Sequence, residues 1–186
     1  MRLFFAVEVP GHIRRSVVSA VAASGLAKPP WRWIPPENFH LTLKFLGDTD
    51  RSTLSAIEDA ACEVAAATSG FELVFGDFGG FPDLKRPRVL FYGITEGFRH
   101  LAALAGRIDE ATAKLGFPPE TRPFKAHLTL ARIKSELSPG LIARLEGFPP
   151  LPGGSRTLVD SFSLVRSHLS GSGASYERLA EFSLRK

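Results

Sequence analysis

The sequence predicts an α+β fold in which two similar lobes, built mainly from antiparallel strands, form one compact domain of residues 1–186. Three observations predict it. Segments with strand character outnumber segments with helical periodicity, and the helices lie between groups of strands instead of following every strand. The tetrapeptide His-Leu-Thr-Leu also occurs once in each half, at residues 40–43 and 127–130.

The first half is expected to run strand, helix, strand, helix. Helical spacing follows the opening apolar run at Ile13, Val17 and Val21, and an Ala-rich second helix is closed by Gly70, which is typical of a helix C-terminus. Two Pro-Pro pairs mark a loop or short edge strand before the first tetrapeptide. The expected strands and helices are residues 2–9, 11–26, 40–46 and 52–68, with a loop at 28–36.

The second half is expected to begin and end with a β-hairpin. A basic loop at residues 82–86 joins the first pair of strands, and a Gly/Ser run at 170–173 turns the last pair. Ser138 at the N-cap and Pro139 at the first helical position open a short helix. The expected strands are 71–81, 87–95, 126–133, 155–165 and 174–184, the helices are 98–115 and 139–145, and a loop spans 149–154.

The composition is that of a soluble globular protein, with 44% hydrophobic and 23% charged residues. A net charge of +4 is compatible with a phosphate-bearing substrate without identifying one. Cys62 is the single cysteine, which excludes an intrachain disulfide and fits a reducing compartment. The apolar N-terminal run is cut by Glu8 and is too short for a signal peptide or a membrane span. We therefore expect a cytoplasmic protein without membrane contact.

Each tetrapeptide places a histidine and a threonine on one face of a strand and two leucines on the other, because side chains alternate along a strand. His40 and Thr42 are then roughly 7 Å apart, as are His127 and Thr129, which is close enough for both members of a pair to contact one phosphate group. If the two strands lie side by side, two imidazoles and two hydroxyls surround the same group.

Those four side chains are what phosphodiester hydrolysis requires. The reaction needs a base for the attacking water, an acid for the leaving oxygen and hydrogen-bond donors for the non-bridging oxygens. Histidine suits both proton roles near neutral pH, because its pKa is about 6.5. Two other interpretations are weaker. One copy alone indicates only a half-buried strand, and a metal site is disfavoured because no carboxylate or cysteine lies at ligand spacing around either motif.

The paired motifs resemble the two-histidine (2H) phosphoesterase superfamily, and within it the RNA 2′,3′-cyclic phosphodiesterase or 2′-5′ RNA ligase (LigT-like) family. The resemblance runs almost from end to end. It includes the opening strand Arg2-Leu3-Phe4-Phe5-Ala6-Val7, the first motif at residues 38–47 and the second at 123–132. One departure is Ala126, where many relatives have proline before the second histidine; it removes no chemical group.

The resemblance implies a bilobal fold with pseudo-twofold symmetry, a cleft lined by both motifs and helices on the outer faces. It implies opening of RNA 2′,3′-cyclic phosphate ends to 2′-phosphates without a metal or other cofactor. By this similarity His40 is the proton donor to the departing 3′ oxygen and His127 is the proton acceptor that activates water, a distinction that the sequence alone does not make. Thr42 and Thr129 complete the catalytic set, and we expect a monomer that acts on RNA ends.

Four further residues are candidates for substrate binding. Lys44 shares the face of His40 by alternation, whereas Arg132 lies on the leucine face and needs a strand end or bulge to reach substrate. Arg88 and Phe124 belong to basic, aromatic-containing segments typical of surfaces that hold RNA backbone and stack bases.

Two other functions stay open. A cyclic phosphodiesterase for small nucleotides uses the same four residues, and a non-catalytic module that binds RNA ends keeps the cleft and uses the histidines as donors. Reverse joining to a 2′-5′ linkage is a further activity that the resemblance implies.

Overall fold

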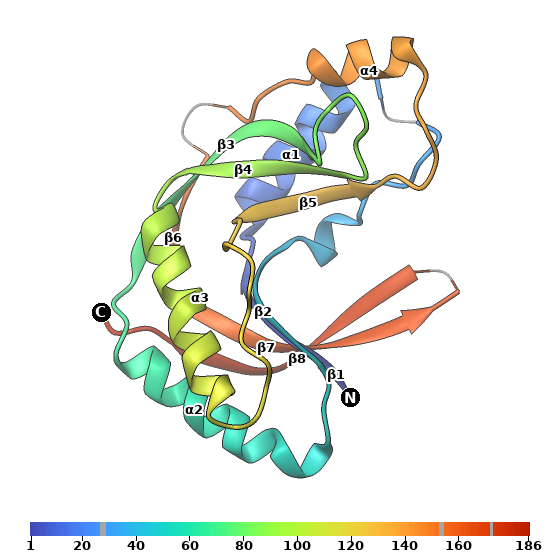
Figure 1. The fold of residues 1–186 in the computed structure, drawn as a ribbon. Helices are drawn as coiled ribbons and strands as arrows, with labels where there is room; N and C mark the ends of the chain where they lie inside the picture. The colour runs from blue at the N-terminus through green and yellow to red at the C-terminus, as the bar shows by residue number, and fades with distance from the viewer. Residues whose placement is uncertain (27–28, 153–154, 172) are drawn as a thin grey trace.

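A computed structural model gives the fold of the chain and describes residues 1–26, 29–152, 155–171 and 173–186. Within these ranges eight strands form two antiparallel sheets of four strands each (Figure 1). The first sheet has the order β2 (His40–Asp48), β1 (Arg2–Glu8), β7 (Ser161–Ser170), β8 (Gly173–Ser183). The second has the order β5 (His127–Arg132), β4 (Val89–Glu96), β3 (Phe71–Phe81), β6 (Arg156–Val159). The expected α+β fold with two lobes is confirmed.

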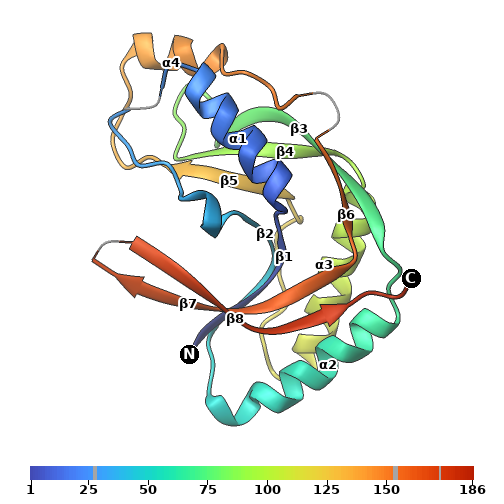
Figure 2. The same ribbon diagram turned by 180° about the vertical axis from the view of Figure 1, so that it is seen from behind.

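Four α-helices connect and cover the sheets. They are α1 (Gly11–Ala23), α2 (Leu54–Ala66), α3 (Phe98–Ala113) and α4 (Pro139–Glu146), with short 3-10 turns η1 (Pro36–Asn38) and η2 (Arg51–Thr53). Helix α3 packs against β2 and helix α2 against β8, so both cover the outer face of the first sheet. Helix α1 lies over the second sheet (Figure 2), where the His12 ring nitrogen Nε2 is 2.9 Å from the carbonyl oxygen of Arg156.

The two lobes repeat one unit of strand, helix and strand. In the first, β1 is followed by α1 and then by β2, which pairs antiparallel with β1. In the second, β4, α3 and β5 follow the same order with the same pairing. In both units the second strand begins with the tetrapeptide and lies at the edge of its sheet. Most buried apolar side chains of both sheets belong to one contiguous hydrophobic cluster, so the lobes share a core, and Phe4, Ala6 and Val165 form a second, smaller cluster.

The expected strand 155–165 is wrong as a single element. The chain pairs with β3 as far as Val159, turns at Asp160 and continues as β7 beside β1 in the other sheet. The backbone N–H of Leu184 donates to the carbonyl of Asp160 at 2.7 Å, which secures the turn. No glycine or proline marks the crossing, so the strand pattern alone gave no sign of it. Parts of three expected loops, namely Lys28, residues 153–154 and Ser172, lie outside the described residues.

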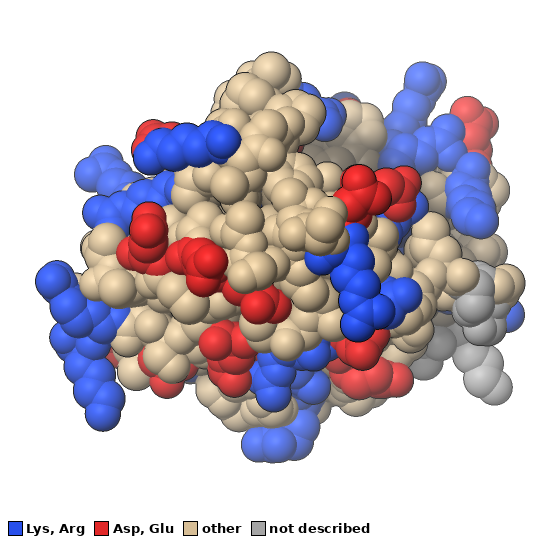
Figure 3. Space-filling model, turned by 90° about the horizontal axis from the view of Figure 1, so that it is seen from below, with Lys and Arg blue, Asp and Glu red and all other residues tan. Residues whose placement is uncertain are grey.

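The surface carries mixed charge. On the face seen from below, Lys and Arg side chains are interspersed with Asp and Glu, and no broad area is covered by basic groups alone (Figure 3). Across the described residues, no helix combines the length and apolar character needed to cross a membrane. The net charge of +4 is therefore not concentrated on this face.

Candidate active site

The two tetrapeptides meet where the edge strands of the two sheets face each other. Strands β2 and β5 contact each other across the space between the sheets. The four leucines of the motifs are buried, whereas both histidines and both threonines are half-buried. The expected alternation within each tetrapeptide is therefore confirmed, and the polar faces of the two motifs lie on the cleft.

The histidine rings are oriented by matching hydrogen bonds. Nδ1 of His40 is 2.8 Å from the carbonyl oxygen of Asn38, and Nδ1 of His127 is 2.6 Å from that of Lys125. A carbonyl can only accept, so in the neutral ring Nδ1 carries the proton and Nε2 carries the lone pair. Neither Nε2 atom has a hydrogen-bond partner among the described residues, which leaves both available to a substrate.

Two aromatic rings pack against each imidazole. The ring of His40 lies 5.0 Å from Phe4 and 5.0 Å from Tyr176 of the β7–β8 hairpin, measured between ring centroids. The ring of His127 lies 5.0 Å from Phe81 and 5.6 Å from Phe91. These contacts restrict ring rotation and remove water from one side of each imidazole.

Burial lowers the pKa of both histidines. For His40 the largest cause is desolvation, and the charges of His127 and Arg132 lower the pKa further. For His127 desolvation is again the largest cause, and the charge of Arg132 lowers the pKa by a smaller amount. The hydrogen bonds to the carbonyls act in the opposite direction but are smaller than the effect of burial. In the free protein both rings are therefore biased toward the neutral form, and a bound phosphate anion supplies the charge that favours protonation.

A β-bulge lies at the last residue of the tetrapeptide in both strands. In β2 the register passes from Thr42, opposite Ala6, to Lys44, opposite Phe5, so Leu43 is an extra residue. In β5 the register passes from Thr129 to Ala131, with Leu130 as the extra residue. The bulges occupy equivalent positions, and each reverses the faces of the residues that follow.

The expectation that Lys44 shares the face of His40 is wrong. Lys44 pairs with Phe5, a core residue, and is only 6% exposed. Its ammonium group donates to the carboxylate of Asp109 on α3 and, at 2.6 Å, to the carbonyl of Pro118. The residue that does lie on the histidine face is Phe45, which is 66% exposed and whose ring is 5.7 Å from that of Phe4.

The bulge at Leu130 likewise brings Arg132 into the cleft. Strict alternation places Arg132 on the leucine face, but the bulge moves it opposite Val89, on the face that carries His127 and Thr129. Its charge lowers the pKa of both catalytic candidates, in keeping with a guanidinium that lies near them. Arg132 is the pseudo-symmetric counterpart of Phe45, so the two lobes place a cation and an aromatic ring at equivalent positions.

A groove of about 600 Å³ adjoins the motifs, and its lining includes Thr42 and His127. It runs between β2, helix α3 and the segment 120–125, which in Figure 1 passes in front of β2 before the chain enters β5. Phe124 lines this groove, as expected for a substrate-binding candidate, and its ring stacks on Phe98 at 6.3 Å.

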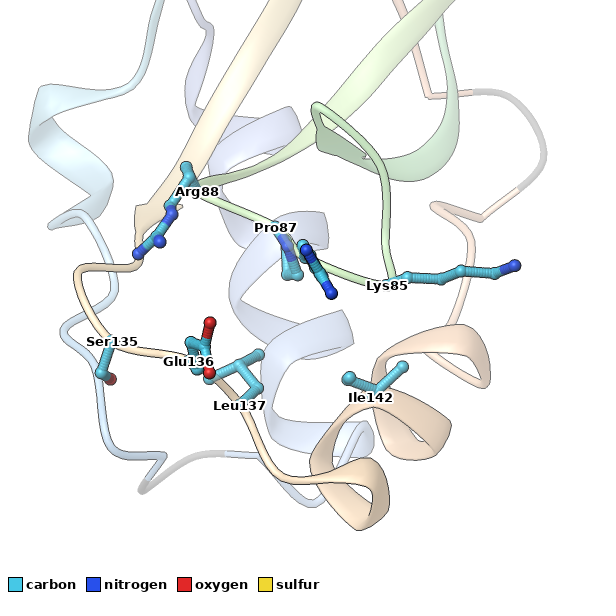
Figure 4. Close-up of a pocket in the computed structure, with 8 residues that line it drawn as sticks. Lys85, Pro87, Arg88, Ser135, Glu136, Leu137 and Ile142 are labelled. Carbon is cyan, nitrogen blue, oxygen red and sulfur yellow. The ribbon is translucent and has the colours of Figure 1, made fainter.

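Arg88 lies elsewhere. Its guanidinium donates to the carbonyl of Lys134 at 2.8 Å and lines a smaller pocket of about 210 Å³ with Lys85, Ser135 and Glu136 (Figure 4). This pocket shares no lining residue with the groove, and three basic residues and one carboxylate, Glu136, line it. Lys85 points away from the pocket in Figure 4.

The residues around the motifs do not form a recognisable metal centre. In the described ranges no three side chains of His, Cys, Asp or Glu are grouped so that they could hold a metal ion. The imidazoles of His40 and His127 lie near the guanidinium of Arg132, and each motif threonine shares the strand face of its histidine. Imidazoles, hydroxyls and a cation are the groups that acid–base chemistry on a phosphate ester requires.

Comparison with known proteins agrees with this geometry. The model of the LigT-like phosphoesterase family matches residues 7–91 and 93–176, and each matched segment contains one tetrapeptide. The chain belongs to the LigT-like phosphoesterase family. It is 35% identical to an RNA 2′,3′-cyclic phosphodiesterase of Thermus thermophilus over 189 aligned residues, which cover 100% of this chain and 91% of the relative.

Solved structures of LigT-like phosphoesterases share the fold. A crystal structure of a Thermus thermophilus protein superposes with a TM-score of 0.82 and 32% identity, covering 100% of this chain and 98% of that one. The crystal structure of Escherichia coli LigT complexed with 3′-AMP gives a TM-score of 0.80 and 28% identity, with the same coverage.

Sequence reasoning missed the residues that orient the histidines. Asn38 and Lys125 act through backbone carbonyls two residues before each histidine, a contact that any residue type provides. The side-chain amide of Asn38 also donates to the carbonyl of Ala174 in β8 at 3.0 Å, which ties the first motif to the hairpin. Tyr176 comes close to His40 from a strand more than a hundred residues away, and nothing local in the sequence indicates that contact.

Proposed function

We propose that this LigT-like phosphoesterase hydrolyses the 2′,3′-cyclic phosphate at the end of an RNA strand to a 2′-phosphate without a metal. One observation carries the proposal, namely two His-Thr pairs on facing edge strands with both Nε2 atoms unpartnered among the described residues. The relative named RNA 2′,3′-cyclic phosphodiesterase and the LigT complex with 3′-AMP support the choice of substrate.

The proton roles follow from an in-line displacement at phosphorus. Water attacks phosphorus while Nε2 of His127 takes its proton, and the bond from phosphorus to the 3′ oxygen breaks while His40 delivers a proton to that oxygen. One proton enters His127 and one leaves His40, so exchange with solvent restores both rings. The assignment of acid to His40 comes from the family resemblance, because the hydrogen bonds of the two rings are alike.

Thr42, Thr129 and Arg132 complete the proposed site. The hydroxyls donate to the non-bridging oxygens, and the guanidinium neutralises the charge that grows on them. A cyclic phosphate carries one negative charge, which offsets the effect of Arg132 on the histidines. Binding of substrate thus raises the pKa of the proton donor when its proton is needed.

The test uses an RNA oligonucleotide with a 2′,3′-cyclic phosphate end, incubated with the protein in EDTA. We expect a 2′-phosphate product, identified by its phosphorus NMR signal. A 3′-phosphate product would contradict the assigned leaving group, and binding without turnover would establish the non-catalytic module instead. Supplying an RNA with a 5′-hydroxyl tests the reverse joining to a 2′-5′ linkage.

A cyclic phosphodiesterase for small nucleotides is the second candidate, because the groove beside the motifs is of a size that takes one small ligand. Comparing a cyclic mononucleotide with a cyclic-ended oligonucleotide separates the two. We further expect a cytoplasmic monomer; light scattering after size exclusion measures the oligomeric state.

A further inference from the structure

The groove beside the catalytic candidates is larger than a cyclic phosphate needs. Its volume of about 600 Å³ is in the range typical of pockets that enclose a whole small ligand. It opens directly from Thr42 and His127, so a ligand whose phosphate sits between the motifs must place its next group in or near it.

Small residues form the inner wall of the groove. Helix α3 presents Ala102, Ala105 and Gly106 to it, none of which has a side chain larger than a methyl group. A Cβ atom built on Gly106 meets no atom within 4 Å, which shows that this position faces open space. A larger residue at 106 would therefore extend into the groove without displacing the protein.

Aromatic rings and cations complete the other walls. Phe45 is 66% exposed at the strand side, and Phe81 and Phe124 line the groove further along. Lys125 holds its ammonium group 5.5 Å from the centre of the Phe81 ring, and at the rim the exposed Arg122 lies 3.7 Å from the carboxylate of Glu120. Apolar walls that carry aromatic rings, with cations beside them, suit a flat aromatic ligand joined to phosphate.

We propose that this groove holds the nucleobase of the nucleotide that carries the cyclic phosphate, and that Gly106 and Ala102 determine how large a base is accepted. This inference rests on the proposed function, because it takes the phosphate to lie between the two motifs. The base is the first apolar group that follows phosphate and ribose along the substrate, and the groove is the apolar space that adjoins the phosphate position.

The test is Gly106→Leu. Leucine is a better helix former than glycine, so the variant is expected to fold, while its branched side chain fills the groove. Gly140→Leu is the matched control: Gly140 lies in α4, a Cβ there also meets nothing within 4 Å, and the position is outside the groove. Thermal melting verifies that both variants are folded.

Comparing two substrates isolates the contribution of the base. One is adenosine 2′,3′-cyclic phosphate, and the other is 1,4-anhydroribitol 2,3-cyclic phosphate, which has the same ring and phosphate but no base. For Gly106→Leu we expect kcat/KM on the adenosine compound to fall about 10-fold to 100-fold, mainly through KM, and to stay within about 2-fold on the compound without a base. Gly140→Leu is expected to match the wild type on both.

Several outcomes would overturn the inference. An equal loss on both substrates would mean that the groove supports the catalytic centre instead of reading the base, and no loss on either would mean that the base lies elsewhere. A loss confined to oligonucleotides would assign the groove to the preceding nucleotide, and a loss confined to joining reactions would assign it to the attacking alcohol.

Failure of the proposed function is visible separately. If the wild type turns over neither of these compounds nor a cyclic-ended RNA oligonucleotide, the proposed hydrolysis is wrong, and equilibrium binding of 2′-AMP to the wild type and to Gly106→Leu still tests the groove. Weaker binding by Gly106→Leu supports the base site, and equal binding refutes it. Phe45→Ala, which removes a ring from the opposite wall without filling the groove, is expected to weaken 2′-AMP binding as well.

Discussion

Lys44 and Asp109 form an ion pair that joins the strand of the first motif to the helix beside the second. The side chain of Lys44 is 5% exposed and that of Asp109 is 22% exposed. Lys44 also donates to the carbonyl of Pro118, and the carboxylate of Asp109 accepts from the backbone N–H of Glu120 at 3.0 Å. The pair thereby anchors the irregular segment between α3 and β5, whose last part supplies the carbonyl that orients His127.

Removing either charge of this pair is expected to destabilise the protein and to impair catalysis. Lys44→Met or Asp109→Asn should lower the free energy of unfolding by about 2 to 4 kcal/mol, because a buried charge loses its partner. The anchored segment then shifts near His127, and kcat should fall about 10-fold to 100-fold. Urea unfolding and turnover of a cyclic mononucleotide measure the two effects.

Glu72→Gln is the matched control, since it breaks the exposed pair of Glu72 with Arg156, whose side chains are 59% and 47% exposed. We expect a change below about 1 kcal/mol and normal turnover. If Lys44→Met behaved like this control, the anchoring role would be refuted.

Replacing either His40 or His127 is expected to abolish most turnover. His40→Ala and His127→Ala should each reduce kcat about 10²-fold to 10⁴-fold in EDTA, because each removes one proton transfer. His12→Ala is the control: this ring lies on α1 and contacts the carbonyl of Arg156, so turnover should not change. Unchanged turnover in both motif variants would rule out the catalytic assignment.

The pH dependence should report the charge of Arg132. The proton donor is active below its pKa and the base above its own, and both values are lowered from 6.5 in the free protein, so kcat/KM should peak on the acid side of pH 6.5. Arg132→Gln removes a cation that depresses both values, so the profile should move to higher pH while kcat falls. Histidine titration by NMR checks the same shift, and an unmoved profile would place Arg132 outside the site.

If RNA also binds outside the groove, kcat/KM should depend on the length of the RNA substrate and on the salt concentration. We expect kcat/KM to be higher for a cyclic-ended oligonucleotide than for a mononucleotide and to fall with salt. Lys85→Gln with Arg86→Gln tests the basic loop before β4, and each lost phosphate contact should reduce the salt slope by about 0.7. Equal turnover of both substrates at all salt concentrations would favour the small-nucleotide function.

Much of the fold could be predicted because local pattern and tertiary structure agree there. Helices α1, α2 and α3 follow from apolar periodicity, and the bond from the backbone N–H of Leu141 to the side chain of Ser138, at 3.4 Å, is the expected N-cap of α4. The change of sheet at Asp160 was not predicted, because a strand that changes partners keeps its extended conformation and its side-chain pattern. Which strands pair depends on contacts between segments far apart in the sequence, and the local sequence does not encode those contacts.

By itself, the sequence determined the chemical groups of the site and their grouping into two His-Thr pairs, because alternation within four residues is a local property of a strand. The tertiary structure alone decided which neighbours join them. A bulge costs one unpaired residue and depends on the strand alongside, so Lys44 turned into the core and Arg132 turned toward the histidines. The groove, likewise, exists because α3 and the segment before β5 pack against β2, and that packing is set by the whole fold.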